Sequence, residues 1–96
     1  MFRIVVGLTV MDRSCRSTSF ERHATLPFAP FLGLEMGWLD RHQEGWSGVV
    51  DTVIWDATNG RFVMELEDWV SDDMDLPAMV AAIGPEWRSC GGGTAA

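Results

Sequence analysis

The chain has 96 residues, the length of one modest domain, and 47% of them are hydrophobic. This content excludes a chain that is disordered throughout, because disorder needs low hydrophobicity. The net charge of −7 comes from 14 acidic residues and seven cationic residues, all arginine, so nucleic-acid binding, which needs a basic stripe, is not expected.

The N-terminal third alternates between apolar and other side chains with a period of two, as a half-buried strand does. Residues 2–10 carry Phe2, Ile4, Val6, Leu8 and Val10 on one face. Residues 16–26 alternate again after a polar turn, with Arg22 interrupting the apolar row. The two segments predict a long hairpin.

A proline-containing loop and a third strand are expected next. Pro27 and Pro30 lack a backbone donor and favour extended neighbours, so residues 26–31 form a loop. Residues 31–38 resume the alternation and predict a strand. Residues 40–45 are polar and predict a turn, and they contain His42, a titratable group that general acid–base catalysis can use. A solvated turn has the same composition, so no catalytic residue is assigned.

Residues 46–56 and 61–69 predict the second hairpin. Its linker closes either as a type I′ turn at Asn59-Gly60, which pairs Trp55 with Met64, or as a type I turn with Gly60 in a bulge, which pairs Trp55 with Phe62. Both registers assign the same, more apolar face to the core. That face carries Val49, Asp51, Val53, Trp55, Phe62, Met64 and Leu66.

Residues 76–83 predict the one helix, because Leu76, Met79, Val80 and Ile83 form a single stripe. Asp75 is its expected cap, Pro77 fits the first turn and Gly84 ends it. A short strand at 86–88 is expected to complete a single globular domain over residues 1–88, followed by a glycine-rich tail over residues 89–96.

These elements predict an α+β fold: a five- or six-stranded antiparallel sheet, or a partly closed small barrel, packed by one C-terminal helix. The chain has no glycine-rich phosphate loop after a strand, and Cys15 and Cys90 lack metal-ligand spacing, so no cofactor and no metal are expected and both thiols are expected to be free. The apolar N-terminus is too short for a signal peptide or membrane span, which predicts a cytoplasmic protein without membrane contact.

Asp51 and Arg22 are the candidate polar contacts of a ligand site. Both stand in apolar rows, and a lone buried carboxylate is costly unless it is paired or protonated. We therefore expect the two to approach each other in an apolar pocket whose walls are Trp38, Trp55 and Phe62. The alternative is that the strand is bulged, or that Asp51 faces solvent.

Charge and aromatic content indicate the kind of partner. Residues 1–30 hold four arginines and two acidic residues, a net charge of +2, whereas residues 31–96 hold three arginines and twelve acidic residues, a net charge of −9. Five Trp and five Phe exceed what a small core hides, and Trp46, Trp69 and Trp87 are expected to be exposed at strand ends. Such aromatic side chains fit a homodimer surface or a pocket for cationic ligands.

The run Leu26-Pro-Phe-Ala-Pro-Phe-Leu-Gly-Leu-Glu, together with the small, acidic, Trp-rich character of the chain, resembles the small orphan bacterial proteins carried on mobile elements such as integron gene cassettes. The resemblance implies a bacterial accessory protein, often oligomeric. It carries over no functional residue.

Three functions are therefore expected, in order of preference. The first is a non-enzymatic binding module, a homodimer that takes an amphipathic or cationic small molecule or a peptide. The second is a small barrel enzyme with Asp51 or His42 as general base. The third is an acidic inhibitor that mimics nucleic acid through residues 65–75.

Overall fold

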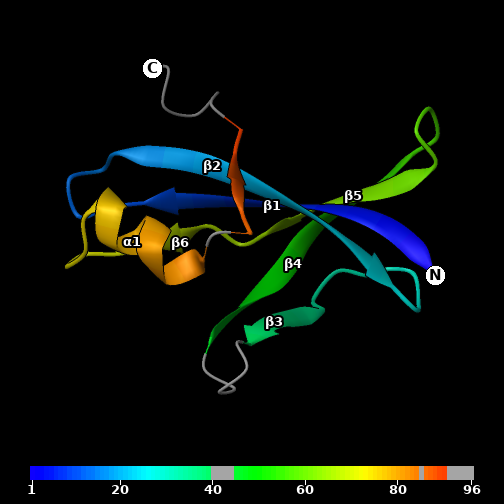
Figure 1. Ribbon diagram of the computed structural model, residues 1–96, viewed down its shortest axis with the longest axis horizontal. Coiled ribbons are helices and arrows are strands. Elements are labelled where there is room, and N and C mark those ends of the chain that lie inside the picture. The colour runs from blue at the N-terminus through cyan, green and yellow to red at the C-terminus, as the bar shows by residue number, and fades with distance from the viewer. Residues whose placement is uncertain (40–44, 85, 91–96) are drawn as a thin grey trace.

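Two hairpins lie side by side and form most of the sheet. The computed structural model describes residues 1–39, 45–84 and 86–90, with the backbone alone for residues 38, 39, 45 and 46 (Figure 1). The elements in chain order are β1 (Phe2–Met11), β2 (Ser17–Leu26), β3 (Glu35–Leu39), β4 (Gly45–Asp56), β5 (Arg61–Leu66), β6 (Trp69–Val70), α1 (Leu76–Ile83) and β7 (Arg88–Ser89). The strand order is β3-β4-β5-β1-β2-β7, and β6 also pairs with β1.

The first predicted hairpin is confirmed. β1 and β2 pair in antiparallel fashion, from Phe2 opposite Leu26 to Met11 opposite Ser17. The alternation predicted for β1 also holds, because Ile4, Val6, Leu8 and Val10 are buried on one face. Val5, on the opposite face, is also buried, so this central strand is covered on both sides over part of its length.

The second hairpin is also confirmed, in the register that pairs Trp55 with Phe62. Gly60 has a φ of +63°, the left-handed conformation that the expected bulge at this position requires. The pairing shifts between Val50 and Thr52, which leaves Asp51 as the extra residue of a β-bulge. As a result Val50 is buried in the core, whereas Val49, the residue predicted there, is only half-buried.

The sheet is mixed, so the prediction of a wholly antiparallel sheet is wrong. β1 pairs in parallel with β5 and with β6, which places the two hairpins side by side. Turn sequences set the antiparallel pairing within each hairpin, but nothing in them fixes how one hairpin meets the other. The described strands leave β3 and β7 as edges, so they do not close into a barrel.

The strand predicted over residues 61–69 is interrupted at Glu67 and Asp68. The pairing with β1 passes from Gly7 opposite Glu65 to Val10 opposite Trp69, so the interruption inserts one residue. This insertion turns Trp69 to the same face as Val10, the core face. The third strand begins at residue 35 and not at 31, because residues 31–34 form a turn in which Gly33 has a φ of +87°.

The helix has the predicted bounds, and the side chain of Asp75 caps it by accepting a hydrogen bond of 3.0 Å from the N–H of Ala78. Met79 and Ile83 pack into the core of the sheet. Trp87, expected to be exposed, is only 6% exposed and joins the same core. β7 follows α1, so the helix is not the last element. Among the described residues, no helix is long and apolar enough to cross a membrane.

Candidate functional site

The structure separates Asp51 from Arg22. Asp51 lies on β4 and Arg22 on β2, and β5 and β1 stand between these two strands in the sheet. Asp51 is exposed, and its carboxylate accepts a hydrogen bond of 3.1 Å from the hydroxyl of Thr52. The predicted burial of Asp51 is therefore wrong, and the alternative that the strand is bulged and Asp51 faces solvent is confirmed. Arg22 lies opposite Val6 and is half-buried.

The predicted aromatic wall is brought together in part. The rings of Trp55 and Phe62 meet edge to face with centroids 4.9 Å apart, and Phe2 meets Phe62 in the same way at 5.8 Å. This aromatic row crosses β4, β5 and β1 at the end of the molecule that holds the N-terminus (Figure 1). The side chain of Trp38 and the whole of His42 lie outside the described residues.

A cavity that the sequence did not predict lies beside α1. Its volume is about 380 Å³. Apolar walls come from three separate elements, with Leu8 on β1, Val49 on β4 and Ala82 on α1. Trp69 of β6 also lines the cavity, because the residue inserted before it turns Trp69 to the face of Val10. The other described residues that line it are Ser47, Gly48, Glu67 and Asp68.

Two carboxylates distinguish this cavity from an ordinary gap in the core. Glu67 and Asp68 are consecutive, both are exposed, and both line the cavity next to Trp69. Their backbone is held in place, since the N–H of Glu67 donates a hydrogen bond of 2.8 Å to the carbonyl of Val49. Among the described residues, the cavity thus combines apolar walls with the indole of Trp69 and two acidic residues.

The sequence contains one signal for this site, the acidic pair Glu67 and Asp68, which the sequence analysis assigned to the acidic stretch 65–75. Glu67 and Asp68 break the apolar alternation of residues 61–69 just before Trp69. An acidic pair at that point indicates that the strand stops, and that the indole changes face. The sequence does not predict the other walls of the cavity. Leu8, Val49 and Ala82 come together only through the parallel pairing of the hairpins and the position of α1.

The two cysteines are free and exposed. Partial burial, and next the carboxylate of Glu21, raise the pKa of the Cys90 thiol, so Cys90 is a weak nucleophile at neutral pH. In the described part of the chain, no three His, Cys, Asp or Glu side chains gather where they could hold a metal ion.

Comparisons with protein-family models, with curated proteins and with solved structures found no match. The geometry of the chain itself therefore carries the functional argument, and the kinship with integron-cassette proteins stays a prediction.

Proposed function

We propose that the protein is a non-enzymatic binding module that acts as a homodimer and takes a small amphipathic cation into the cavity beside α1. The observation that carries this proposal is a cavity with apolar walls that is also lined by Glu67, Asp68 and Trp69. Small-molecule pockets are commonly apolar cavities of about 300–1,000 Å³ with a few placed polar groups. The volume of about 380 Å³ falls at the small end of that range.

Each wall contributes a different part of the recognition. Leu8, Val49 and Ala82 offer apolar surface, and burying apolar surface of a ligand is worth roughly 25 cal/mol per Å². Glu67 and Asp68 attract a cation toward the cavity, and the net charge of −7 adds to that attraction. The indole of Trp69 can stabilise a cationic head group over its ring face.

A charge-removal experiment tests this proposal with benzyltrimethylammonium as the probe, measured by isothermal titration calorimetry. The double variant Glu67→Gln/Asp68→Asn is expected to bind the probe about fivefold to tenfold more weakly, the effect of losing two exposed attractive charges. The matched control is Glu35→Gln/Asp72→Asn, which removes the same two charges from exposed positions outside the cavity.

A volume test separates the cavity from its charge. Ala82→Phe places a ring where the helix lines the cavity and is expected to abolish binding while the protein stays folded, because Ala82 is exposed on α1. Equal weakening in the two charge-removal variants would show attraction by net charge alone and contradict the site. Saturable binding that survives Ala82→Phe would also contradict it.

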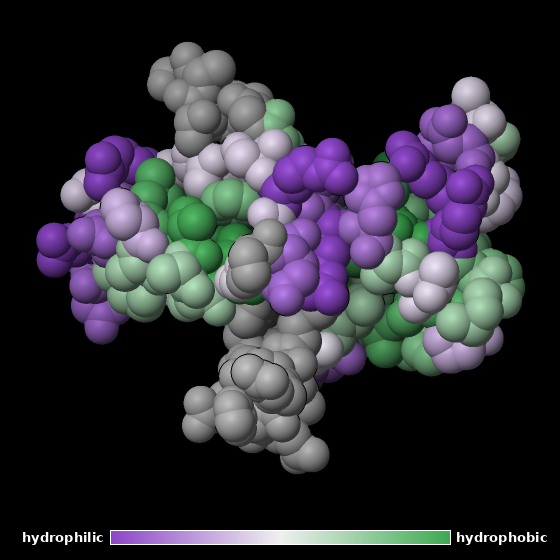
Figure 2. Space-filling model, viewed as in Figure 1, coloured by the Kyte–Doolittle hydropathy of each residue, from purple (hydrophilic) through white to green (hydrophobic). Residues whose placement is uncertain are grey.

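The homodimer proposal rests on the aromatic end, which we define as Phe2, Phe28, Phe31, Leu32 and Trp55. All five side chains are exposed, and Figure 2 shows hydrophobic residues gathered at the end of the molecule that holds the N-terminus. Arg3 and Arg61 flank this end, whereas the acidic residues 65–75 lie toward the end that holds α1 (Figure 1). Two copies that meet through their aromatic ends keep their most acidic parts apart, which lowers the repulsion between two chains of charge −7.

Sedimentation analysis tests the dimer. We expect wild type to be dimeric at micromolar concentration and Trp55→Ala to be monomeric, since large exposed aromatic side chains are favoured anchors of interfaces. Val80→Ala, which shortens an exposed apolar side chain on α1 at the other end, is expected to leave the dimer intact. A monomeric wild type would refute this part of the proposal and leave the cavity untouched.

A further inference from the structure

Two arginines stand next to each other on the sheet face that α1 does not cover. β1 and β5 are parallel neighbours with Ile4 opposite Phe62, so the preceding residues, Arg3 and Arg61, are also side by side. Like charges at facing positions of neighbouring strands are unfavourable. This pair is unexpected in a chain that has twice as many acidic residues as basic ones.

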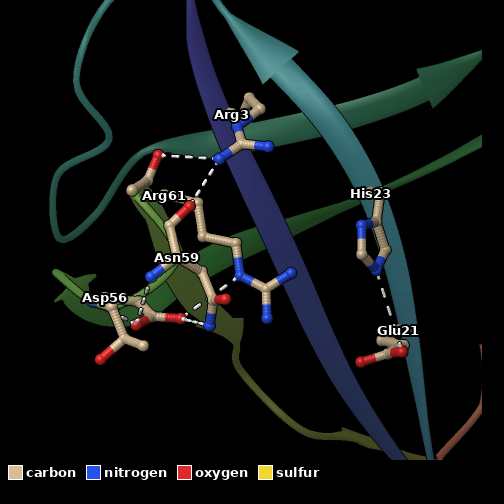
Figure 3. Close-up of polar contacts among 8 residues, drawn as sticks. Arg3, Glu21, His23, Asp56, Asn59 and Arg61 are labelled. Atoms are coloured by element: carbon tan, nitrogen blue, oxygen red, sulfur yellow. Dashed lines mark hydrogen bonds and ion pairs between the residues drawn. The ribbon is translucent and has the colours of Figure 1, made fainter.

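Both guanidinium groups are held in place by the turn that joins β4 to β5 (Figure 3). Arg3 Nη2 donates hydrogen bonds to the backbone carbonyls of Asn59 and Gly60. Arg61 Nε faces Asp56 Oδ2 at 3.4 Å, and Figure 3 shows the Arg61 side chain extended toward β1. These contacts hold the two guanidinium groups in position without a ligand.

The two arginines line an open depression of about 350 Å³. His23 and Thr25 of β2 form its other side, and Ile4 and Ala24 also contribute to the lining. His23 is exposed and comes within 3.9 Å of Glu21 on the side away from Arg3. The depression therefore presents two fixed cations, a hydroxyl and an imidazole to one small volume.

The local charge does not cancel. Asp56 offsets the charge of Arg61, whereas the contacts recorded for the Arg3 guanidinium in the described part of the chain are with carbonyl oxygens, which carry no full charge. Glu21 adds a negative charge on the far side, beside His23, so the excess positive charge is confined to the side of the depression where Arg3 and Arg61 lie. An anion between Arg3 and Arg61 would relieve the repulsion between them.

We infer that this depression is a second binding site, independent of the cavity beside α1, and that it takes the oxyanion group of a small molecule, a phosphate ester or a carboxylate. The planar guanidinium group of arginine can donate two parallel hydrogen bonds, a geometry that matches the oxygens of a phosphate or a carboxylate. The Thr25 hydroxyl and the His23 imidazole are in position to add donors. A long polyanion such as nucleic acid is disfavoured, because beyond this depression it would meet a chain of net charge −7.

The test uses the intact protein with inorganic phosphate and with succinate as separate probes, at constant ionic strength set with sodium chloride. Isothermal titration calorimetry gives the affinities, and two-dimensional amide NMR locates the perturbed residues. We expect saturable binding with a dissociation constant below about 10 mM and amide shifts centred on residues 3 and 25. The tighter of the two probes identifies the oxyanion.

The key variant is Arg3→Gln, with Arg13→Gln as the matched control. Arg3→Gln removes one charged donor from the site and is expected to weaken binding about tenfold or more. Arg13 is exposed in the turn between β1 and β2, so Arg13→Gln makes the same charge change away from the depression. Equal weakening in both variants, shifts centred elsewhere, or no saturable binding to either probe would overturn the inference. Failure of the amphipathic-cation site would leave the inference standing, because none of the described residues lines both sites.

Discussion

The two ends of the molecule use one sheet in opposite ways. At the end covered by α1, Val6, Leu8 and Val10 of β1 are at most 3% exposed beneath the helix and its surroundings. At the aromatic end the same strand begins with Phe2, which is 41% exposed, and Trp55 on β4, which also contacts Phe62, is 53% exposed. Both rows are built from large apolar side chains, so composition alone does not decide which row is buried.

The position of α1 determines which of the two apolar rows is buried. α1 has eight residues and covers only the part of the sheet that it contacts, through Met79 and Ile83. No helix in the described part of the chain covers the aromatic end, where the rings of Phe2, Phe62 and Trp55 pack on one another instead. Stability is therefore concentrated at the helix end, whereas the surface for association lies at the aromatic end.

Truncation at the two ends gives the largest expected contrast. Met79 is 0% exposed, so Met79→Ala should lower the free energy of unfolding by about 2–5 kcal/mol. Trp55→Ala loses part of one edge-to-face contact and should lower it by about 1 kcal/mol. Urea unfolding at the lowest usable protein concentration, where dimerisation contributes least, measures both. Equal losses would mean that the aromatic end is as tightly packed as the core.

Two glycines sharpen the comparison at the level of single atoms. A Cβ at Gly48 of β4 would lie 2.9 Å from Leu66 Cδ1, and Leu66 is buried, whereas a Cβ at Gly37 of β3 would meet nothing within 4 Å. Gly48→Ala should therefore cost about 1–3 kcal/mol of stability through overpacking. Gly37→Ala should gain about 0.5 kcal/mol, because alanine loses less backbone entropy on folding. Thermal unfolding of both variants decides the matter, and a stable Gly48→Ala protein would show that Leu66 can move aside.

The sequence predicts the local elements well because each has a local cause. The hairpins follow from alternation and turn residues, and the bounds of α1 follow from its apolar stripe, Asp75 and Gly84. The errors in side-chain facing within the second hairpin come from single inserted residues. Strict alternation places Asp51 in the core row, but one extra residue in β4 moves Asp51 outside and Val50 inside. A lone carboxylate in an apolar row was the available signal for that bulge.

The candidate sites were harder to predict because both depend on how the hairpins meet. Arg3 and Arg61 are neighbours only because β1 and β5 pair in parallel. Leu8 and Ala82 share a cavity only because α1 packs beside β1. Neither arrangement produces a periodic pattern in the sequence. The sequence therefore predicts that Trp55 and Phe62, which share one hairpin, lie together, but it does not predict the lining of either candidate site.

An aspartate organises a turn at each end and provides the subtlest test of the comparison. Asp12 accepts hydrogen bonds from the N–H groups of Ser14 and Arg16 and pairs with the Arg16 guanidinium at 3.0 Å. Asp56 accepts from the side chain of Asn59 and pairs with Arg61 at 3.4 Å. The Asp12 side chain is 0% exposed and that of Asp56 is 22% exposed, so the helix end again holds the more buried group.

The pKa of each carboxyl group lies below its ordinary value of 3.8. For Asp12, burial works against the ionised form, but the hydrogen bonds from Arg16 and Ser14 and the Arg16 charge together outweigh it. For Asp56, the hydrogen bond from the Asn59 side chain contributes most. A lowered folded-state pKa means stability that is present above the unfolded-state value, near 3.8, and lost as the pH falls through the folded-state value.

Asp12→Asn and Asp56→Asn should therefore both destabilise the protein at neutral pH, and Asp12→Asn more, because its partners would be left around a buried neutral group. The gap between wild type and each variant should narrow as the pH falls from about 5 toward 2, because wild type then protonates the same carboxyl group. Chemical unfolding as a function of pH measures both gaps. A gap that stays constant over this range would mean that the carboxylate charge does not hold the turn, and a larger effect for Asp56→Asn would place the tighter turn at the aromatic end.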